Sequence, residues 1–310
     1  MKKDKHQTEP NVLHSFAHLL GTEVKNRRLE IPEKMGKGYC AGFVFNEYIR
    51  MLIFNYELNE DLVLENSDIN ASLRMILFKF QLKAIPSVLI ATSRVNTDAL
   101  IPIDTNNVAI NIEMDADYLN GLFDLSATSP VLQSLLQNTQ PLLFEQMIYP
   151  SLQKIVDEIM DEVVTESIDE TFELFFLRIK AEELICRLLM ELVKRNETHL
   201  YPLNSQDILT LYKIKEQILA HPETPPVINE LAAHANMSPS KLKRLFKQIF
   251  GSPIFSYYQA FRMKEAARIL KEDKLSVSDV GYQLGFTNLS HFSRVFHEHI
   301  GMKPKQYSRS

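Results

Sequence analysis

The chain has little cysteine and no long apolar run. Its 310 residues include two cysteines, Cys40 and Cys186, which are too few for a disulfide framework and fewer than a zinc site normally uses. We therefore expect reduced thiols, no metal and no cofactor. No apolar stretch reaches the ~18 to 20 residues that cross a membrane, and the N-terminal MKKDKHQTEP lacks the apolar centre of a signal peptide. These absences predict a cytoplasmic protein that has no membrane partner.

Acidic and basic residues are divided unevenly along the chain, although its net charge is only -5. Residues 205–310 contain 15 Lys+Arg and 9 Asp+Glu, whereas residues 1–204 contain 19 and 30. A basic end attracts the phosphate backbone of nucleic acid, so this division predicts that the C-terminal part alone binds nucleic acid. With 45% hydrophobic residues, the chain is long enough for two or three domains that have cores of their own.

An internal repeat between residues 227 and 310 is the most informative feature of the sequence. Identical residues recur 50 positions apart without a gap. Each copy has a short helical segment, a tight turn and an amphipathic helix that ends at glycine, which is the pattern of a helix-turn-helix motif. The repeated pairs are Val227 and Val277, Ser240 and Ser290, Arg244 and Arg294, Phe246 and Phe296, Gly251 and Gly301, and Tyr257 and Tyr307.

The first copy opens with a predicted helix at residues 227–235, and Asn236 and Met237 form its turn. Ser238 is the expected cap of the second helix, with Pro239 at its first position. Apolar residues at spacings of three and four form the buried stripe of this helix, and polar or cationic residues cover the opposite face. The stripe is Leu242, Leu245, Phe246 and Ile249, and the opposite face is Ser240, Lys241, Lys243, Arg244 and Lys247.

The second copy opens with a predicted helix at residues 277–284, turns at Gly285 and Phe286, and has Asn288 as its expected cap. A helical bundle with a solvated basic face would explain one such copy. Two copies that both direct their polar residues away from the stripe favour DNA binding. The second stripe is Phe292, Val295, Phe296 and Ile300, and the opposite face carries Ser290, His291 and Arg294.

A single helix is predicted between the two copies, at residues 253–271. At 1.5 Å per residue it would be roughly 28 Å long, which is close to the ~34 Å between successive major grooves on one side of B-DNA. One chain would then place two recognition helices in adjacent grooves.

The string SVSDVGYQLGFTNLSHFSRVFHEHIGMKPKQY resembles the second half of the AraC/XylS-type regulator domain. That family places a small residue and GF before N-x-S-x-F-S-R-x-F and closes with G-x-x-P-x-x-Y. The matching residues are Gly281, Gly285, Phe286, Asn288, Ser290, Phe292, Ser293, Arg294, Phe296, Gly301, Pro304 and Tyr307. The resemblance implies a seven-helix domain in which both recognition helices contact bases.

The resemblance also implies, by position, which residues of each recognition helix contact bases. In the first recognition helix they are Ser240, Lys243 and Arg244, while Lys241 and Lys247 are expected to contact the DNA backbone. In the second recognition helix they are Leu289, Ser290, His291 and Arg294.

Between residues 29 and 114 the sequence is typical of β-structure. Runs rich in aromatic and branched residues are separated by Asn, Asp and Pro, and some runs are apolar on both faces. This pattern predicts covered strands in a small barrel or sandwich. The predicted strands are residues 40–45, 48–58, 73–82, 87–91 and 107–113.

In the AraC family such an N-terminal half is often a cupin-like barrel that binds a small effector. This stretch lacks the H-x-H and later histidine of metal-binding cupins, so an oxygenase or isomerase of that fold is disfavoured. An effector would enter an apolar cavity, and the alternative is that the same side chains fill the core. The candidate lining residues are Phe43, Phe45, Met51, Phe54, Phe78 and Phe80.

After Asp117 the apolar period becomes helical, with helices predicted at residues 130–138, 150–162 and 168–195. The last helix is apolar on more than one face and needs two partners. The resemblance favours a second subunit as one partner, because many of these regulators pair through helices. Burial of both faces within one subunit is the alternative. The candidate dimer residues are Phe172, Phe176, Ile179 and Leu189.

We predict an α+β chain in four parts: a β-rich effector domain (1–130), a helical connector (131–200), a linker (201–206) and an AraC-type DNA-binding domain (207–310). The predicted function is a transcription regulator, of activator or repressor type, controlled by a small-molecule effector. Its expected partners are double-stranded DNA, a second copy of the chain and RNA polymerase. The alternatives are an effector-independent dimeric regulator and a β-barrel enzyme fused to a DNA-binding domain.

Overall fold

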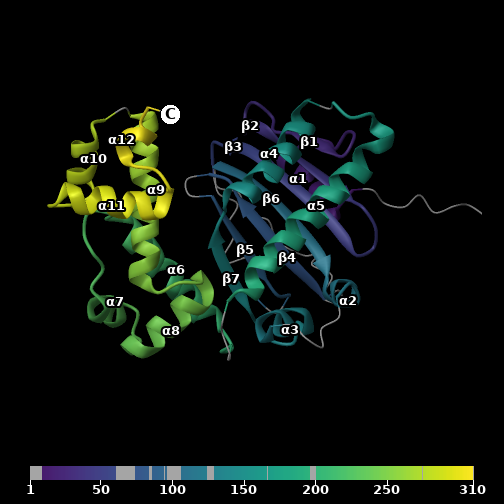
Figure 1. Cartoon of the computed structure of the whole chain (residues 1–310). Helices are drawn as coiled ribbons and strands as arrows, with labels where there is room; N and C mark the ends of the chain where they lie inside the picture. The colour runs from purple at the N-terminus through teal and green to yellow at the C-terminus, as the bar shows by residue number, and fades with distance from the viewer. Residues whose placement is uncertain are drawn as a thin grey trace, which may run out of the picture. The chain divides into compact units, whose positions relative to one another are not determined.

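The computed structural model of the protein describes residues 9–60, 74–83, 86–93, 95, 106–123, 129–165, 167–195, 200–273 and 275–309. The chain forms two compact units, Met1–Ser205 and Gln206–Ser310, and each is described by itself (Figure 1). The predicted strand start at Leu73 lies outside the described residues. Among the helices that the structure describes, none combines the length and apolarity that a membrane crossing requires.

The first unit is built on an antiparallel sheet, which has seven strands in its described residues. These are β1 (Arg28–Glu30), β2 (Gly36–Val44), β3 (Ile49–Leu58), β4 (Met75–Gln81), β5 (Ser87–Ala91), β6 (Asn106–Asp115) and β7 (Leu143–Met147). Their order across the sheet is β1-β2-β3-β6-β4-β5-β7. In the register, Ile53 of β3 lies opposite Ile110 of β6, and Phe78 of β4 lies opposite Ile112. Branched and aromatic pairs of this kind stabilise neighbouring strands.

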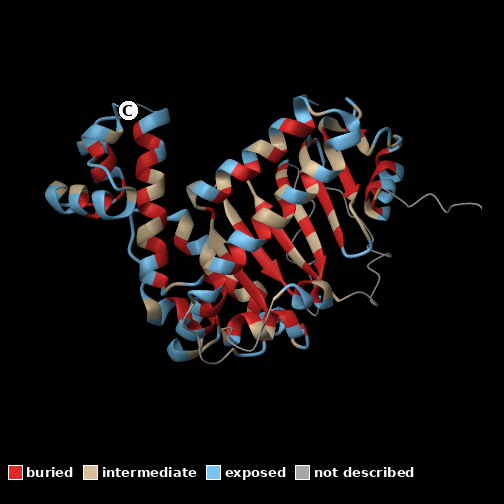
Figure 2. Cartoon of the chain, turned by 45° about the vertical axis from the view of Figure 1, so that its right-hand side comes forward, coloured by how far each residue is buried: buried red, intermediate tan, exposed pale blue. Residues whose placement is uncertain are grey.

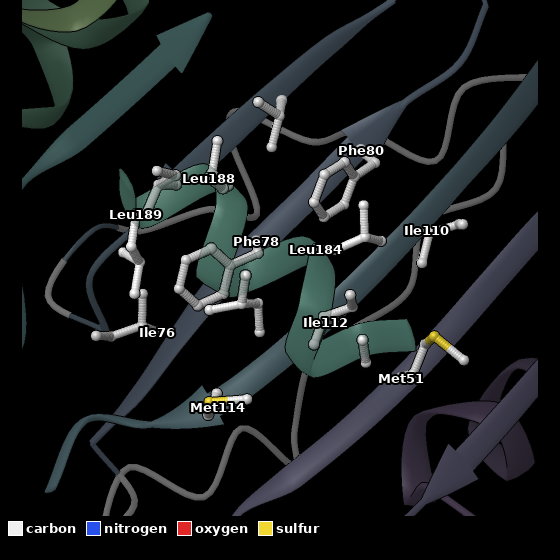
Figure 3. Close-up of a cluster of buried hydrophobic side chains, with 14 of the residues drawn as sticks. Met51, Ile76, Phe78, Phe80, Ile110, Ile112, Met114, Leu184, Leu188 and Leu189 are labelled. Carbon is white, nitrogen blue, oxygen red and sulfur yellow. The ribbon is translucent and has the colours of Figure 1, made fainter. Parts of the chain in front are cut away.

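Helices cover both faces of this sheet (Figure 2). They are α1 (Asn11–Leu20), α2 (Ala116–Gly121), α3 (Pro130–Gln137), α4 (Pro150–Thr165) and α5 (Glu170–Val193). On one face, α3, α4 and α5 enclose the larger apolar core, in which Phe78 packs with Leu184 and Leu188 (Figure 3). On the other face, Phe16 of α1 packs with Cys40 of β2, and burial raises the pKa of the Cys40 thiol well above its usual range.

The α+β class is confirmed, whereas the predicted barrel or sandwich differs from the structure. Within the described residues, β1 and β7 are the two edges of one open sheet. The strands are apolar on both faces because helices cover both. A sequence pattern records that a strand face is buried, but not whether a helix or a second sheet buries it. In addition, β7 lies inside the predicted connector and pairs with β5, so residues 131–200 contribute to the sheet.

Helices joined by loops make up the described residues of the second unit, which contain no strand. Its helices are α6 (Ser205–Ala220), α7 (Ile228–His234), α8 (Pro239–Phe250), α9 (Ile254–Glu272), α10 (Val277–Gln283), α11 (Leu289–Ile300) and α12 (Pro304–Tyr307). Helix α9 contacts α8, α10, α11 and α12. The predicted helices of both repeats and the predicted helix between them are therefore confirmed.

Helix α5 gives a direct test of which of its faces holds the first unit together. Leu188 is fully buried against the sheet, whereas Met190, two positions further along, lies on the opposite face of the helix and is 62% exposed. Leu188→Ala should lower the free energy of unfolding by about 2 to 5 kcal/mol because it leaves a cavity. Val164→Ala, at a 59% exposed site on α4, is the control and should change it by less than about 0.5 kcal/mol. Denaturant unfolding of the full chain, followed by circular dichroism, measures both, and equal effects would contradict the packing described.

Candidate nucleic-acid interface

Helix α8 is held with its apolar stripe inward and its basic face outward. It begins at the predicted cap, where Ser238 Oγ accepts a hydrogen bond of 3.2 Å from the backbone N–H of Lys241. It ends at Gly251, whose φ of 74° is the left-handed conformation that favours glycine. The whole predicted stripe is buried. On the opposite face the exposed residues are Ser240, Lys243, Arg244 and Lys247.

Helix α11 repeats this arrangement. Asn288 Oδ1 accepts a hydrogen bond of 3.0 Å from the backbone N–H of His291, and the helix ends at Gly301 with a φ of 81°. Its buried residues are Phe292, Val295 and Phe296, and its exposed outer residues include Ser290, His291 and Arg294. Both predicted caps are confirmed, so each recognition helix starts at the position that the repeat predicts.

The turns of the two motifs are not equivalent, although the sequence repeat has no gap. In the first motif the left-handed residue is Asn236, two positions before the cap Ser238. In the second motif it is Gly285, three positions before the cap Asn288. The second turn therefore contains one more residue, Thr287, before its cap, and the residue after the left-handed position is Phe286, which is 5% exposed, where the first turn has Met237.

Helix α9 sets the distance between the motifs. Its 19 residues correspond to roughly 28 Å, and Figure 1 shows α7 and α8 near one end and α10 and α11 near the other. The Tyr257 ring lies 5.6 Å from the Phe246 ring of α8, and Met263 packs in a cluster with Phe292 and Phe296 of α11. Both recognition helices are thus attached to the same helix through their buried stripes.

Several of the predicted DNA-contacting residues, among them Lys241 and Leu289, also make contacts within the unit. Lys241 Nζ lies 2.8 Å from Asp207 Oδ1, so this ion pair joins α8 to the start of α6. Leu289 is half-buried, and its side chain packs against Gly281. A Cβ added at Gly281 would lie 2.7 Å from Leu289 Cδ2. Sequence reasoning did not find Asp207, because nothing local connects it to a lysine 34 positions away. Both residues have a packing role whatever they do on DNA.

The two recognition helices differ in charge. The positions of Lys241 and Lys247 in α8 are taken by His291 and His297 in α11. Lysine is a fixed cation at neutral pH, whereas histidine is only partly protonated there. Of the two helices, α8 therefore provides the stronger attraction for phosphate groups.

Five of the six predicted effector residues share one face of the sheet. These five are Phe43, Phe45, Met51, Phe78 and Phe80, and they belong to or border the core beneath α5. Phe54 lies on the opposite face, in the cluster around α1. Side chains alternate along a strand, so Phe54 and Met51 cannot line the same cavity, and Phe54 is removed from the set.

The predicted dimer residues divide between the two faces of α5. Leu189 is 3% exposed and faces the sheet, so its inclusion was wrong. Phe176 is half-buried against the same core. Phe172 and Ile179 are 61% and 44% exposed. The structure adds exposed apolar residues that the prediction did not contain, namely Phe175 at 65% and Met190 at 62%.

Two capped recognition helices on one connecting helix define the second unit as a double helix-turn-helix domain, a class that binds DNA. A family model described as a helix-turn-helix domain matches residues 231–310. The transcriptional regulator GbdR of Pseudomonas aeruginosa is 32% identical over 95 residues, which are 31% of this chain and 26% of that protein. The arabinose operon regulatory protein of Escherichia coli is 32% identical over 80 residues, which are 26% of this chain and 27% of that protein.

A solved AraC-type transcriptional regulator from Chromobacterium violaceum is 26% identical, with a TM-score of 0.32, and covers 34% of this chain and 95% of that one. The chain matches about a quarter of the length of the curated relatives named above. The family model assigns residues 231–310 to a helix-turn-helix domain, and transcription regulators are among the proteins to which this chain is similar.

The unequal charge of the recognition helices leads to a prediction about two equivalent arginines. Arg244→Ala should weaken binding by about 1 to 3 kcal/mol if the side chain reads a base, and Arg294→Ala should weaken it less, because α11 has fewer fixed cations. Fluorescence anisotropy measures both on a duplex that the full chain selects from a random-sequence pool. Glu298→Ala, an exposed change on α11, is the control, and a larger loss for Arg294→Ala would contradict the asymmetry.

Proposed function

We propose that the chain is a sequence-specific transcription regulator that places α8 and α11 in adjacent major grooves of double-stranded DNA. The observation that carries this proposal is the pair of capped helices fixed to α9, with their polar and cationic faces exposed. The helix length of roughly 28 Å is compatible with the ~34 Å groove repeat. The relatives named above support a regulatory role.

A small-molecule effector would act through the first unit. Phe78 and Phe80 are fully buried between the sheet and α5, and an apolar ligand that separates these layers would favour one state of the unit over another. Such a shift would change DNA affinity, dimer geometry or contact with RNA polymerase. The same burial favours a second candidate, an effector-independent regulator in which these rings only fill the core. Unchanged melting temperature and DNA affinity across a metabolite panel would select the second candidate.

A second copy of the chain is the proposed partner of α5. The exposed apolar residues of this helix form a stripe from Phe172 to Val193, a length of roughly 32 Å. Near its middle, Glu182 and Glu183 form ion pairs with Arg178 and Arg187 at 3.0 and 2.8 Å, so the carboxylates there are compensated. An exposed apolar stripe of this length is typical of a protein–protein contact. The members are Phe172, Phe175, Ile179, Cys186, Met190 and Val193.

Footprinting on the region upstream of the protein's own gene tests the DNA-binding proposal. Hydroxyl-radical cleavage should show two protected segments for each subunit, about 10 base pairs apart, because two helices enter successive grooves. Repeating the experiment with cell extract tests for an effector. Protection of one segment per subunit would contradict the two-helix docking, and no protection on any duplex would contradict the function itself.

A charge placed in the α5 stripe tests the dimer. Phe175→Glu should raise the dissociation constant of the dimer by at least about tenfold, because a carboxylate would have to be buried at the contact. Val164→Glu makes the same change at a 59% exposed site on α4 and should leave association unchanged. Sedimentation of the full chain measures both variants. A monomeric wild type, or equal effects of the two substitutions, would contradict the assignment of the stripe.

A further inference from the structure

In addition to α9, a second set of contacts joins the two helix-turn-helix motifs. It starts in the loop between α6 and α7, which leads into the first motif, and it ends at the turn of the second motif. At Gly285 a Cβ would lie 2.2 Å from the carbonyl oxygen of Glu223. The turn of the second motif thus packs directly on the backbone of this loop, and its left-handed φ of 77° makes that approach available to glycine.

Tyr258 joins the same loop to α9. Its side chain is fully buried, and its hydroxyl donates a hydrogen bond of 2.8 Å to the carbonyl oxygen of Pro222. Burial raises the pKa of this hydroxyl, so it remains a donor at neutral pH. The loop is therefore held on two sides, by Tyr258 of α9 and by Gly285 of the second turn.

Arg262, one turn further along α9, joins Tyr258 to the second motif. The guanidinium carbon lies 5.0 Å from the centre of the Tyr258 ring and 4.0 Å from that of Phe286. The guanidinium also donates to the carbonyl oxygen of Leu284, at the end of α10, and to Gln259 Oε1. Only 5% of Arg262 is exposed, so these contacts are made away from solvent and are correspondingly strong.

These contacts meet at Phe286, which directly follows the left-handed Gly285 and is the ring on which Arg262 stacks. The matching residue of the first turn is Met237, because Met237 and Phe286 each donate a backbone hydrogen bond to the carbonyl oxygen five residues earlier. Methionine has no ring on which a guanidinium can stack. The second turn therefore offers α9 an aromatic contact that the first turn does not, and the Pro222–Glu223 loop packs on the same turn at Gly285.

We propose that Arg262 is a positioning residue that fixes the angle and separation of the two recognition helices, and so determines the spacing of the two base-pair segments that the protein reads. This inference rests on the proposed function. A single helix such as α9 can bend and leaves the twist between two attached motifs weakly fixed. The contacts of Arg262 with Leu284 and Phe286, and of Tyr258 with Pro222, add points that resist that motion.

The test uses the full chain and the duplex that the wild type selects from a random-sequence pool. One base pair is inserted between the two protected segments, and the ratio of dissociation constants, inserted over original, defines a spacing penalty. For the wild type we expect a penalty of about 10- to 100-fold, because one helix is displaced from its bases. Arg262→Met should reduce the penalty to a few-fold. Arg268→Met, on the exposed side of the same helix, should keep the wild-type value.

The spacing penalty is a ratio for one protein, so a loss of stability alone does not change it. A folded Arg262→Met variant with the wild-type penalty would overturn the inference. If that variant does not fold, Tyr258→Phe decides, because it removes only the hydroxyl that donates to Pro222, and an unreduced penalty there would equally overturn it. A wild type that selects no duplex refutes the proposed function, whereas a wild type that binds at either spacing equally well refutes only the inference about Arg262.

Discussion

Apolar packing on α9 is the constraint on which the C-terminal unit depends. The two motifs span residues 228–250 and 277–300, and segments below about 40 residues rarely bury enough surface to fold alone. Helix α9 completes both cores, with Tyr257 against the rings of Phe246 and Phe250 at 5.6 and 5.5 Å and Met263 and Ile269 in the cluster around Phe296. Because one helix belongs to both cores, anything that moves α9 moves both recognition helices.

The secondary structure of this unit could be predicted because its signals are local. Apolar spacing identified the stripes of α8 and α11, and Ser238 and Asn288 marked their starts through side-chain caps within the same turn. The strands of the first unit were found by similar means, except β1 and β7. Strand β1 has three residues, too few to establish an alternation, and the sequence of β7, LFEQM, contains no β-branched residue. The pairing order of the sheet depends on contacts between distant segments.

The residues that sequence reasoning misplaced show where local patterns end. Phe54 and Leu189 are apolar members of elements that were themselves predicted correctly, but the face of each depends on its exact phase in the strand or helix. The Lys241–Asp207 ion pair and the contacts of Arg262 connect segments 34 and 22 positions apart. Neither set of contacts produces a periodic pattern in the sequence. From the sequence alone Arg262 cannot be distinguished from an exposed cation, although the structure buries it.

The charge difference between the recognition helices and the connection through Arg262 have a common consequence. Helix α8 carries Lys243, Arg244 and Lys247 on its exposed face, so it can be held on phosphate by long-range attraction. Helix α11 has histidines at two of the positions where α8 has lysines, and its own attraction is weaker. Once α8 is docked, a rigid connection holds α11 at a high effective concentration near the next groove. This compensates for the weaker attraction of α11 for phosphate. A flexible connection would lower that concentration, so we infer that the motif with fewer fixed cations is the one that needs the additional contacts of its turn.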